Sequence, residues 1–176
     1  MLMTKAYGKV IKTHIVNKLR VRNISDLCKL PGKGESVHIV TQKNITRHTF
    51  TEWVLGSGVI DAIYISTYRF SVKNISVLKK YMDDGVISSA TILLAQNYKM
   101  LLKNASDEFD EIVERSDIIL SLGYNHSKVT LLQSGKNYFV LTGSGNYSEN
   151  DHIEEYQMYN DKELFEFHRE WITNGK

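Results

Sequence analysis

The chain lacks the features that would place it in a membrane or in an oxidising compartment. It has no run of 18 or more apolar residues, the length that a membrane-spanning helix needs. Its first residues do not show the charged and then apolar arrangement of a signal peptide. Cys28 is the single cysteine, which excludes an intramolecular disulfide and suits a reducing compartment. We therefore expect a cytoplasmic protein without a membrane span.

Proline is nearly absent as well, and the one that is present marks the clearest break in the sequence. Pro31 begins a turn that contains two glycines. This break predicts a basic N-terminal arm at residues 1–35, followed by a main domain at residues 36–176. A chain of 176 residues can bury one substantial core but is too short for two full domains.

Charge is distributed unevenly between these two parts. Residues 1–35 hold eight basic and two acidic side chains, a net charge of +6, so the rest of the chain carries −4 within a total of +2. A basic leading segment favours a polyanion such as nucleic acid as the partner. A solvated pair of surface strands with no partner explains the same distribution equally well.

From residue 37 onward, short apolar runs typical of strands alternate with stretches of helical spacing. We expect strands at residues 37–40, 62–67, 91–94, 117–122 and 153–159. We expect helices at residues 50–55, 75–82 and 99–115. A hairpin is expected from residues 128–132 and 138–141 around a loop at 133–137. A closing helix should follow, with Asp161 as its N-cap and an apolar stripe of Leu164, Phe165, Phe167, His168 and Trp171. This order predicts an α/β sandwich whose mixed sheet is flanked by helices.

A histidine and a lysine stand two residues apart where the strand at 117–122 ends and the hairpin begins. These residues are His126 and Lys128. In extended backbone, residues two apart project from the same face, and catalytic groups often gather at strand ends. Such a pair also occurs by chance, so a structural or surface role is the ordinary explanation of this motif alone.

A second polar motif follows the other strand of the hairpin. Small residues there would let backbone N–H groups approach a phosphate. Because the hairpin loop lies midway between the motifs, antiparallel pairing would bring the two together. A simple polar turn is the alternative, and the motif is not a dinucleotide fingerprint, since Ser148 occupies the third glycine position. The residues of this motif are Gly143, Ser144, Gly145 and Asn146.

Together the motifs resemble those of the phospholipase D superfamily, H-x-K-x4-D followed by G-S-x-N and an acidic residue on the next strand. His126 and Lys128 match the first motif, and residues 143–146 match the second. Glu154 or Glu155 stands at the acidic position. In element order the resemblance extends from about residue 36 to the C-terminus. It implies a phospholipase D-like α/β sandwich with a mixed sheet.

The resemblance also implies phosphodiester cleavage through a covalent phosphohistidine, without a metal or another cofactor. His126 would be the nucleophile, and Lys128 would balance charge on the phosphoryl oxygens. Ser144 and Asn146 would donate hydrogen bonds to those oxygens through the transition state. Glu154 would orient the imidazole by accepting its other N–H group.

Two departures from the family pattern shape the expected function. The chemistry uses two histidines, and no second H-x-K occurs in the chain, so a homodimer must bring two His126 side chains together. Gln133 replaces the aspartate of the first motif, which leaves a weakly active or inactive nucleic-acid-binding module as an alternative. Size and the basic segment favour an endonuclease, with DNA preferred to RNA, over a phospholipid hydrolase or transferase, which stays a further alternative. The expected substrate-binding residues are Tyr68, Arg69, Gly143 and Gly145.

Overall fold

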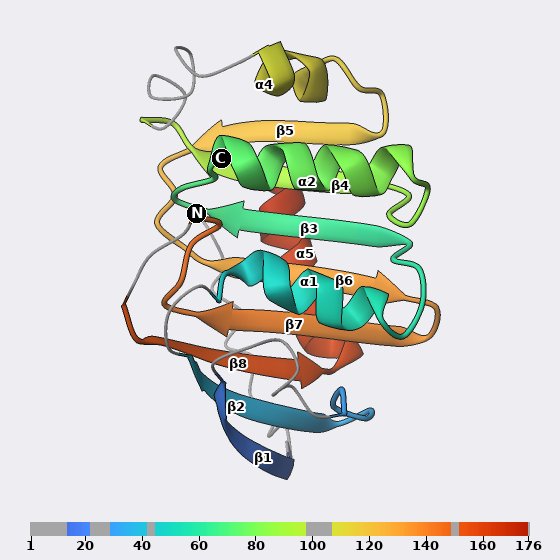
Figure 1. Cartoon of the computed structure of the whole chain (residues 1–176), viewed down its shortest axis with the longest axis vertical. Coiled ribbons are helices and arrows are strands. Elements are labelled where there is room, and N and C mark those ends of the chain that lie inside the picture. Colours follow the sequence, from blue (N-terminus) through green and yellow to red (C-terminus); the bar gives the residue numbers. More distant parts are fainter. Residues whose placement is uncertain (1–13, 22–28, 42–44, 98–106, 149–151, 176) are drawn as a thin grey trace, which may run out of the picture.

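The computed structural model describes residues 14–21, 29–41, 45–97, 107–148 and 152–175, and in them the chain forms one eight-stranded mixed sheet flanked by helices (Figure 1). The strands are β1 (His14–Val21), β2 (Glu35–Thr41), β3 (Ala62–Thr67), β4 (Ala90–Ala95), β5 (Ile118–Gly123), β6 (Val129–Ser134), β7 (Asn137–Gly143) and β8 (Glu154–Asn160). The helices are α1 (Arg47–Leu55), α2 (Val72–Asp83), α4 (Asp107–Val113) and α5 (Lys162–Asn174). The expected α/β sandwich with a mixed sheet is confirmed.

The sheet combines parallel and antiparallel strands, in the order β1-β2-β8-β7-β6-β3-β4-β5. Strands β3, β4 and β5 run parallel, whereas β6, β7 and β8 form an antiparallel meander that joins β3 through β6. The carboxyl ends of β3, β4 and β5 therefore lie at the edge where β6 begins and β7 ends. Ligand sites in such sheets form outside the carboxyl ends of the parallel strands.

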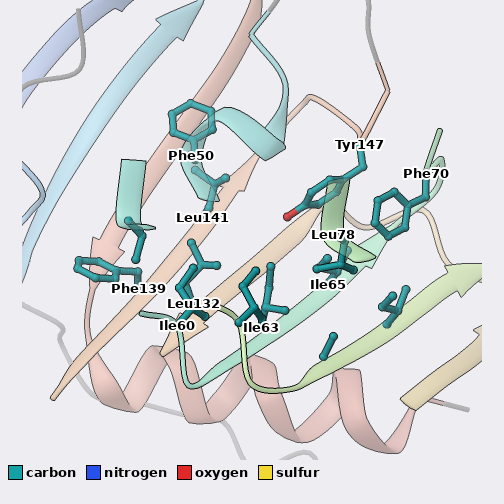
Figure 2. Packing of buried hydrophobic residues seen from close by; sticks show 14 of the residues in the cluster. Phe50, Ile60, Ile63, Ile65, Phe70, Leu78, Leu132, Phe139, Leu141 and Tyr147 are labelled. Carbon is teal, nitrogen blue, oxygen red and sulfur yellow. The ribbon is translucent and has the colours of Figure 1, made fainter. Parts of the chain in front are cut away.

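The helices cover both faces of the sheet, with α1 and α2 on one and α5 on the other (Figure 1). The larger hydrophobic cluster lies on the α1 and α2 side, and Figure 2 shows its residues Phe50, Ile63 and Leu132. A smaller cluster around Phe165 and Ile172 packs α5 against the opposite side. Because the central strands are buried on both faces, β4 reads as a continuous apolar run rather than as an alternating one.

The strand positions agree with the sequence pattern, and the differences have local causes. Helix α1 begins at Arg47, earlier than expected, because a polar first turn carries no apolar periodicity. The hairpin turn consists of only two residues, 135 and 136, in place of the expected five-residue loop. Asp161 caps α5 as expected, since its side chain accepts a hydrogen bond from the Leu164 N–H at 3.0 Å. Phe167 was expected in the buried stripe but is 52% exposed.

Part of the segment predicted to be a basic arm belongs to the sheet. Strand β1 lies at residues 14–21 and pairs in parallel with β2 at the sheet edge. Residues 1–13 and 22–28 lie outside the described residues, as do residues 98–106 of the helix expected at 99–115. The division of the chain at residue 35 stays a prediction.

Candidate active site

The imidazole of His126 and the ammonium group of Lys128 lie together at the carboxyl edge of the parallel strands. Lys128 Nζ is 3.3 Å from His126 Nδ1 and donates a hydrogen bond to the His126 carbonyl at 2.8 Å. His126 is exposed, and Lys128 is half-buried. Burial and the nearby Arg47 lower the pKa of Lys128, while Glu154 acts in the opposite direction. The two motif side chains thus meet, as their spacing predicts.

The backbone beside His126 is held by Asn125. The Asn125 side-chain amide donates to main-chain carbonyls at the ends of β3 and β4, at 3.3 and 2.9 Å, and to Ser66 Oγ at 2.9 Å. Its carbonyl oxygen accepts hydrogen bonds from the N–H and the hydroxyl of Ser127, at 2.9 and 2.6 Å. Asn125 therefore ties the β5–β6 connection to two neighbouring strands and fixes the backbone next to His126.

Ser144, at the end of the second hairpin strand, is bonded to the first residues of β8. Its N–H donates to the Glu155 carbonyl at 3.0 Å, and its hydroxyl oxygen accepts from the Glu155 N–H at 3.1 Å. The same hydroxyl donates to the Glu154 carboxylate. Glu154 is thus placed beside Ser144 and close enough to influence Lys128. The orientation of His126 by Glu154 stays a prediction.

Two further residues of the second motif, Gly143 and Gly145, are glycines because β8 approaches them closely. Gly143 has a φ of +148°, and a Cβ there would lie 2.2 Å from the Glu155 carbonyl oxygen. A Cβ on Gly145 would lie 1.8 Å from the Tyr156 hydroxyl. These contacts provide a packing reason for both glycines, and their binding of substrate stays a prediction.

The remaining predicted site residues come from the β3–α2 connection and from the end of the second motif. Asn146 Oδ1 accepts a hydrogen bond from the Thr67 hydroxyl at 3.4 Å, which ties the motif to the end of β3. The Tyr68 ring lies against the His126 ring, with 4.9 Å between centroids. Arg69 is exposed, and its guanidinium lies 6.0 Å from the centre of the Tyr68 ring. Tyr68 is therefore part of the histidine's surroundings, and Arg69 flanks it.

A buried arginine on the α1 side of the sheet joins the two motifs. The sequence pattern did not indicate this residue. Arg47, on the first turn of α1, is completely buried. Its guanidinium donates to the Lys128 carbonyl at the start of β6. It also donates to the carbonyls of Leu141, Gly143 and Gly145 at 3.0, 3.2 and 2.6 Å. One side chain thus holds the main chain on both sides of the hairpin mouth.

The charge of Arg47 is stabilised mainly by neutral dipoles. Burial lowers its pKa to about 10, although Tyr147, Tyr156 and Glu154 raise it again in part. The guanidinium also lies 5.6 Å from the centre of the Tyr156 ring. The sequence gives no signal for this residue, because its partners lie more than 80 positions away.

Gln133, which replaces the aspartate of the family motif, lies far from His126. It occupies the opposite end of β6, where its main-chain carbonyl accepts a hydrogen bond from the Asp61 N–H at 2.8 Å. It stands five residue steps along the strand from Lys128, a span of roughly 16 Å. Gln133 therefore cannot touch a phosphate bound between His126 and Lys128.

A cleft of about 590 Å³ opens beside His126 on the α5 side of the sheet. It is bounded by the β5–β6 connection and by the last turns of α5, with Leu93 at the end of β4 between them. In the described part of the chain, no three His, Cys, Asp or Glu side chains come together as metal ligands. None of the described helices is long and apolar enough to cross a membrane.

The sequence matches no family model and no curated protein, but solved structures share its fold. The phosphatidylserine synthase of Haemophilus influenzae Rd KW20 aligns with a TM-score of 0.55 at 12% identity, over 79% of this chain and 38% of the synthase. This synthase belongs to the phospholipase D superfamily. The chain has a phospholipase D-like fold.

A second solved structure with this fold is that of a DNA-binding protein. TrmBL2, an archaeal chromatin protein whose structure shows a novel mode of DNA binding, aligns with a TM-score of 0.52 at 15% identity. The alignment covers 78% of this chain and 50% of TrmBL2. This chain thus spans half or less of the length of either protein.

Proposed function

We propose that this protein is a metal-independent phosphodiesterase, an endonuclease whose active site is completed in a homodimer. The observation that carries the proposal is the contact between the exposed His126 ring and the Lys128 ammonium at the open edge of the sheet. The second motif ends at the same mouth of the hairpin, where it presents the Ser144 hydroxyl. A nucleophile, a cation and a hydroxyl donor together suit displacement at phosphorus.

The reaction proceeds by two displacements. His126 forms an N–P bond with its ring nitrogen while the P–O bond to the leaving strand breaks, and the partner's His126 gives its proton to the leaving oxygen. The partner's His126, now neutral, then takes a proton from water. The water oxygen attacks phosphorus, and the N–P bond breaks and restores His126. Lys128 offsets the phosphoryl charge in both steps.

The contact with Lys128 determines which ring nitrogen of His126 carries the proton before the substrate binds. An ammonium group can only donate, so Nδ1 accepts and the proton of a neutral His126 ring resides on Nε2. Attack through Nε2 therefore requires Lys128 to move to a phosphate oxygen and the ring proton to move to Nδ1. Binding of the phosphate moves Lys128, because it offers the ammonium group a charged acceptor. Once Lys128 has left Nδ1, exchange with solvent moves the ring proton from Nε2 to Nδ1.

The position of Gln133 supports activity. Because this residue lies at the far end of β6, loss of the motif aspartate leaves the groups around His126 in place. Gln133 therefore affects the local structure of β6 and does not contact the bound phosphate.

DNA binding without cleavage is the second candidate, and the shared fold with TrmBL2 favours it. In that case the hairpin mouth would hold a phosphate without displacing an ester oxygen. Binding would then weaken with salt, as contacts to a polyanion do, and would survive loss of His126.

The test is turnover in excess chelator by wild type, His126→Ala and the control His38→Ala, which alters a histidine of β2. The probes are single-stranded DNA, duplex DNA and methyl p-nitrophenyl phosphate. We expect wild type and His38→Ala to cleave and His126→Ala to lose at least about 1,000-fold in rate. Salt-sensitive DNA binding without turnover in all three proteins would establish the second candidate. Turnover of a phosphatidyl lipid alone would assign the site to lipid.

A further inference from the structure

The cleft beside His126 has no role in the displacement at phosphorus. Its first wall is the β5–β6 connection, residues 123–127, which includes His126 itself. Its second wall is the C-terminal half of α5. A volume of about 590 Å³ lies within the range of small-molecule sites in proteins. The cleft thus includes the proposed nucleophile in its wall, whereas Lys128 is not one of its lining residues.

Aromatic rings line the cleft and are open to solvent. Tyr124 is 99% exposed, and Phe167 is 52% exposed. Trp171 also lines the cleft, is half-buried against the smaller hydrophobic cluster, and donates its indole N–H to His168 at 3.1 Å. Aromatic faces of this kind stack with nucleobases irrespective of base identity.

The charges of the cleft are unsuited to a phosphate. Among the residues that the structure describes, no lysine or arginine lines it, and Glu170 is the acidic side chain in its wall. A phosphate would be repelled by Glu170, whereas a neutral planar group would not. Glu170 and Asn174 offer a carboxylate and an amide, which are groups that pair with base edges.

We infer that this cleft is a nucleobase subsite, which takes one base of the strand whose phosphate lies at His126. The inference rests on the proposed function and adds the substrate class to it. A base inside a duplex is already stacked and paired, so it can enter the cleft only from a single strand or an unpaired region. The substrate is therefore single-stranded or locally unpaired nucleic acid.

The experiment measures binding in the His126→Ala chain, so that its outcome does not depend on cleavage. The probes are a fluorescent single-stranded DNA and an abasic strand of the same length, measured by anisotropy. We expect Tyr124→Ala with Phe167→Ala to weaken binding of the normal strand by roughly 10-fold or more and to leave the abasic strand unchanged. Phe167→Trp should retain binding, since it keeps an aromatic face. Val59→Ala, at a position 55% exposed outside the cleft, is the control.

The other outcomes would overturn either the inference or the proposed function, and they distinguish the two. Unchanged binding of the normal strand, or an equal loss for both strands, excludes a base in the cleft. A shift from dimer to monomer with unchanged affinity would make the cleft an interface between two copies of the chain. Base-dependent binding in a protein that never cleaves would refute the proposed function alone, and cleavage without base dependence would refute the inference alone.

Discussion

The two faces of the sheet differ at the edge that carries His126. On the α1 side, Arg47 is completely buried and bonds to main-chain carbonyls of both motifs. On the α5 side, an open cleft with exposed aromatic rings reaches the same histidine. One face holds the site in position, and the other leaves it accessible.

This difference separates two requirements of a catalytic site. The hairpin mouth must be rigid, and a buried guanidinium with several acceptors achieves this because each lost bond would leave a buried carbonyl unsatisfied. The substrate must also reach His126. The hydrophobic cluster under α5 is the smaller of the two, and the cleft on that side leaves room for the substrate. Single substitutions can weaken one face and leave the other intact.

Replacement of Arg47 should have the largest effect on the closed face. Arg47→Met leaves the carbonyls of Lys128, Leu141, Gly143 and Gly145 without their donor. We expect the free energy of unfolding to fall by roughly 3 kcal/mol or more. Urea denaturation measures it, with Arg169→Met as the control because Arg169 pairs with Glu166 at the surface. Equal midpoints for the two variants would show that Arg47 does not hold the hairpin.

The substitution Gly145→Ala tests the packing of the same face, because it adds a Cβ atom where β8 approaches closely. The Cβ of Gly145→Ala would lie 1.8 Å from the Tyr156 hydroxyl, so we expect a loss of about 1–3 kcal/mol in unfolding free energy. Tyr156→Phe in the same chain removes that oxygen and should recover part of the loss, which a double-mutant cycle measures. Gly56→Ala is the control, since the nearest atom to its Cβ would be 3.4 Å away. Additive effects of the two site substitutions would exclude the clash.

A smaller effect is expected on the open face from His168. Burial lowers the pKa of His168 from 6.5, so the folded chain binds this proton less readily than the unfolded chain. Stability from this group is therefore complete above pH 6.5 and is lost as the pH falls below it. Thermal denaturation at pH 7.5 and 5 should show a smaller loss for His168→Gln than for wild type. An identical loss would show that His168 does not contribute to it.

The sequence predicted those features of the fold and of the site that depend on local residue patterns. Apolar runs located the strands from β2 to β8, and the position of the hairpin loop placed the two motifs at one mouth. Arg47 could not be foreseen, because its partners are distant in the chain and a single arginine before a helix has no distinctive spacing. Phe167 was grouped with the apolar stripe, although it lies about 200° around the helix from the buried Phe165. Strand β1 was missed because a basic segment at a sheet edge resembles a solvated arm.

The most direct test of a shared active site is a mixing experiment in excess chelator. Wild type and His126→Ala are combined in varied ratios, allowed to exchange subunits, and assayed on single-stranded DNA. If two His126 side chains make one site, activity falls with the square of the wild-type fraction, to about one quarter in an equal mixture. A linear fall to about one half would show that each chain is a complete site, and no turnover by pure wild type would contradict cleavage itself.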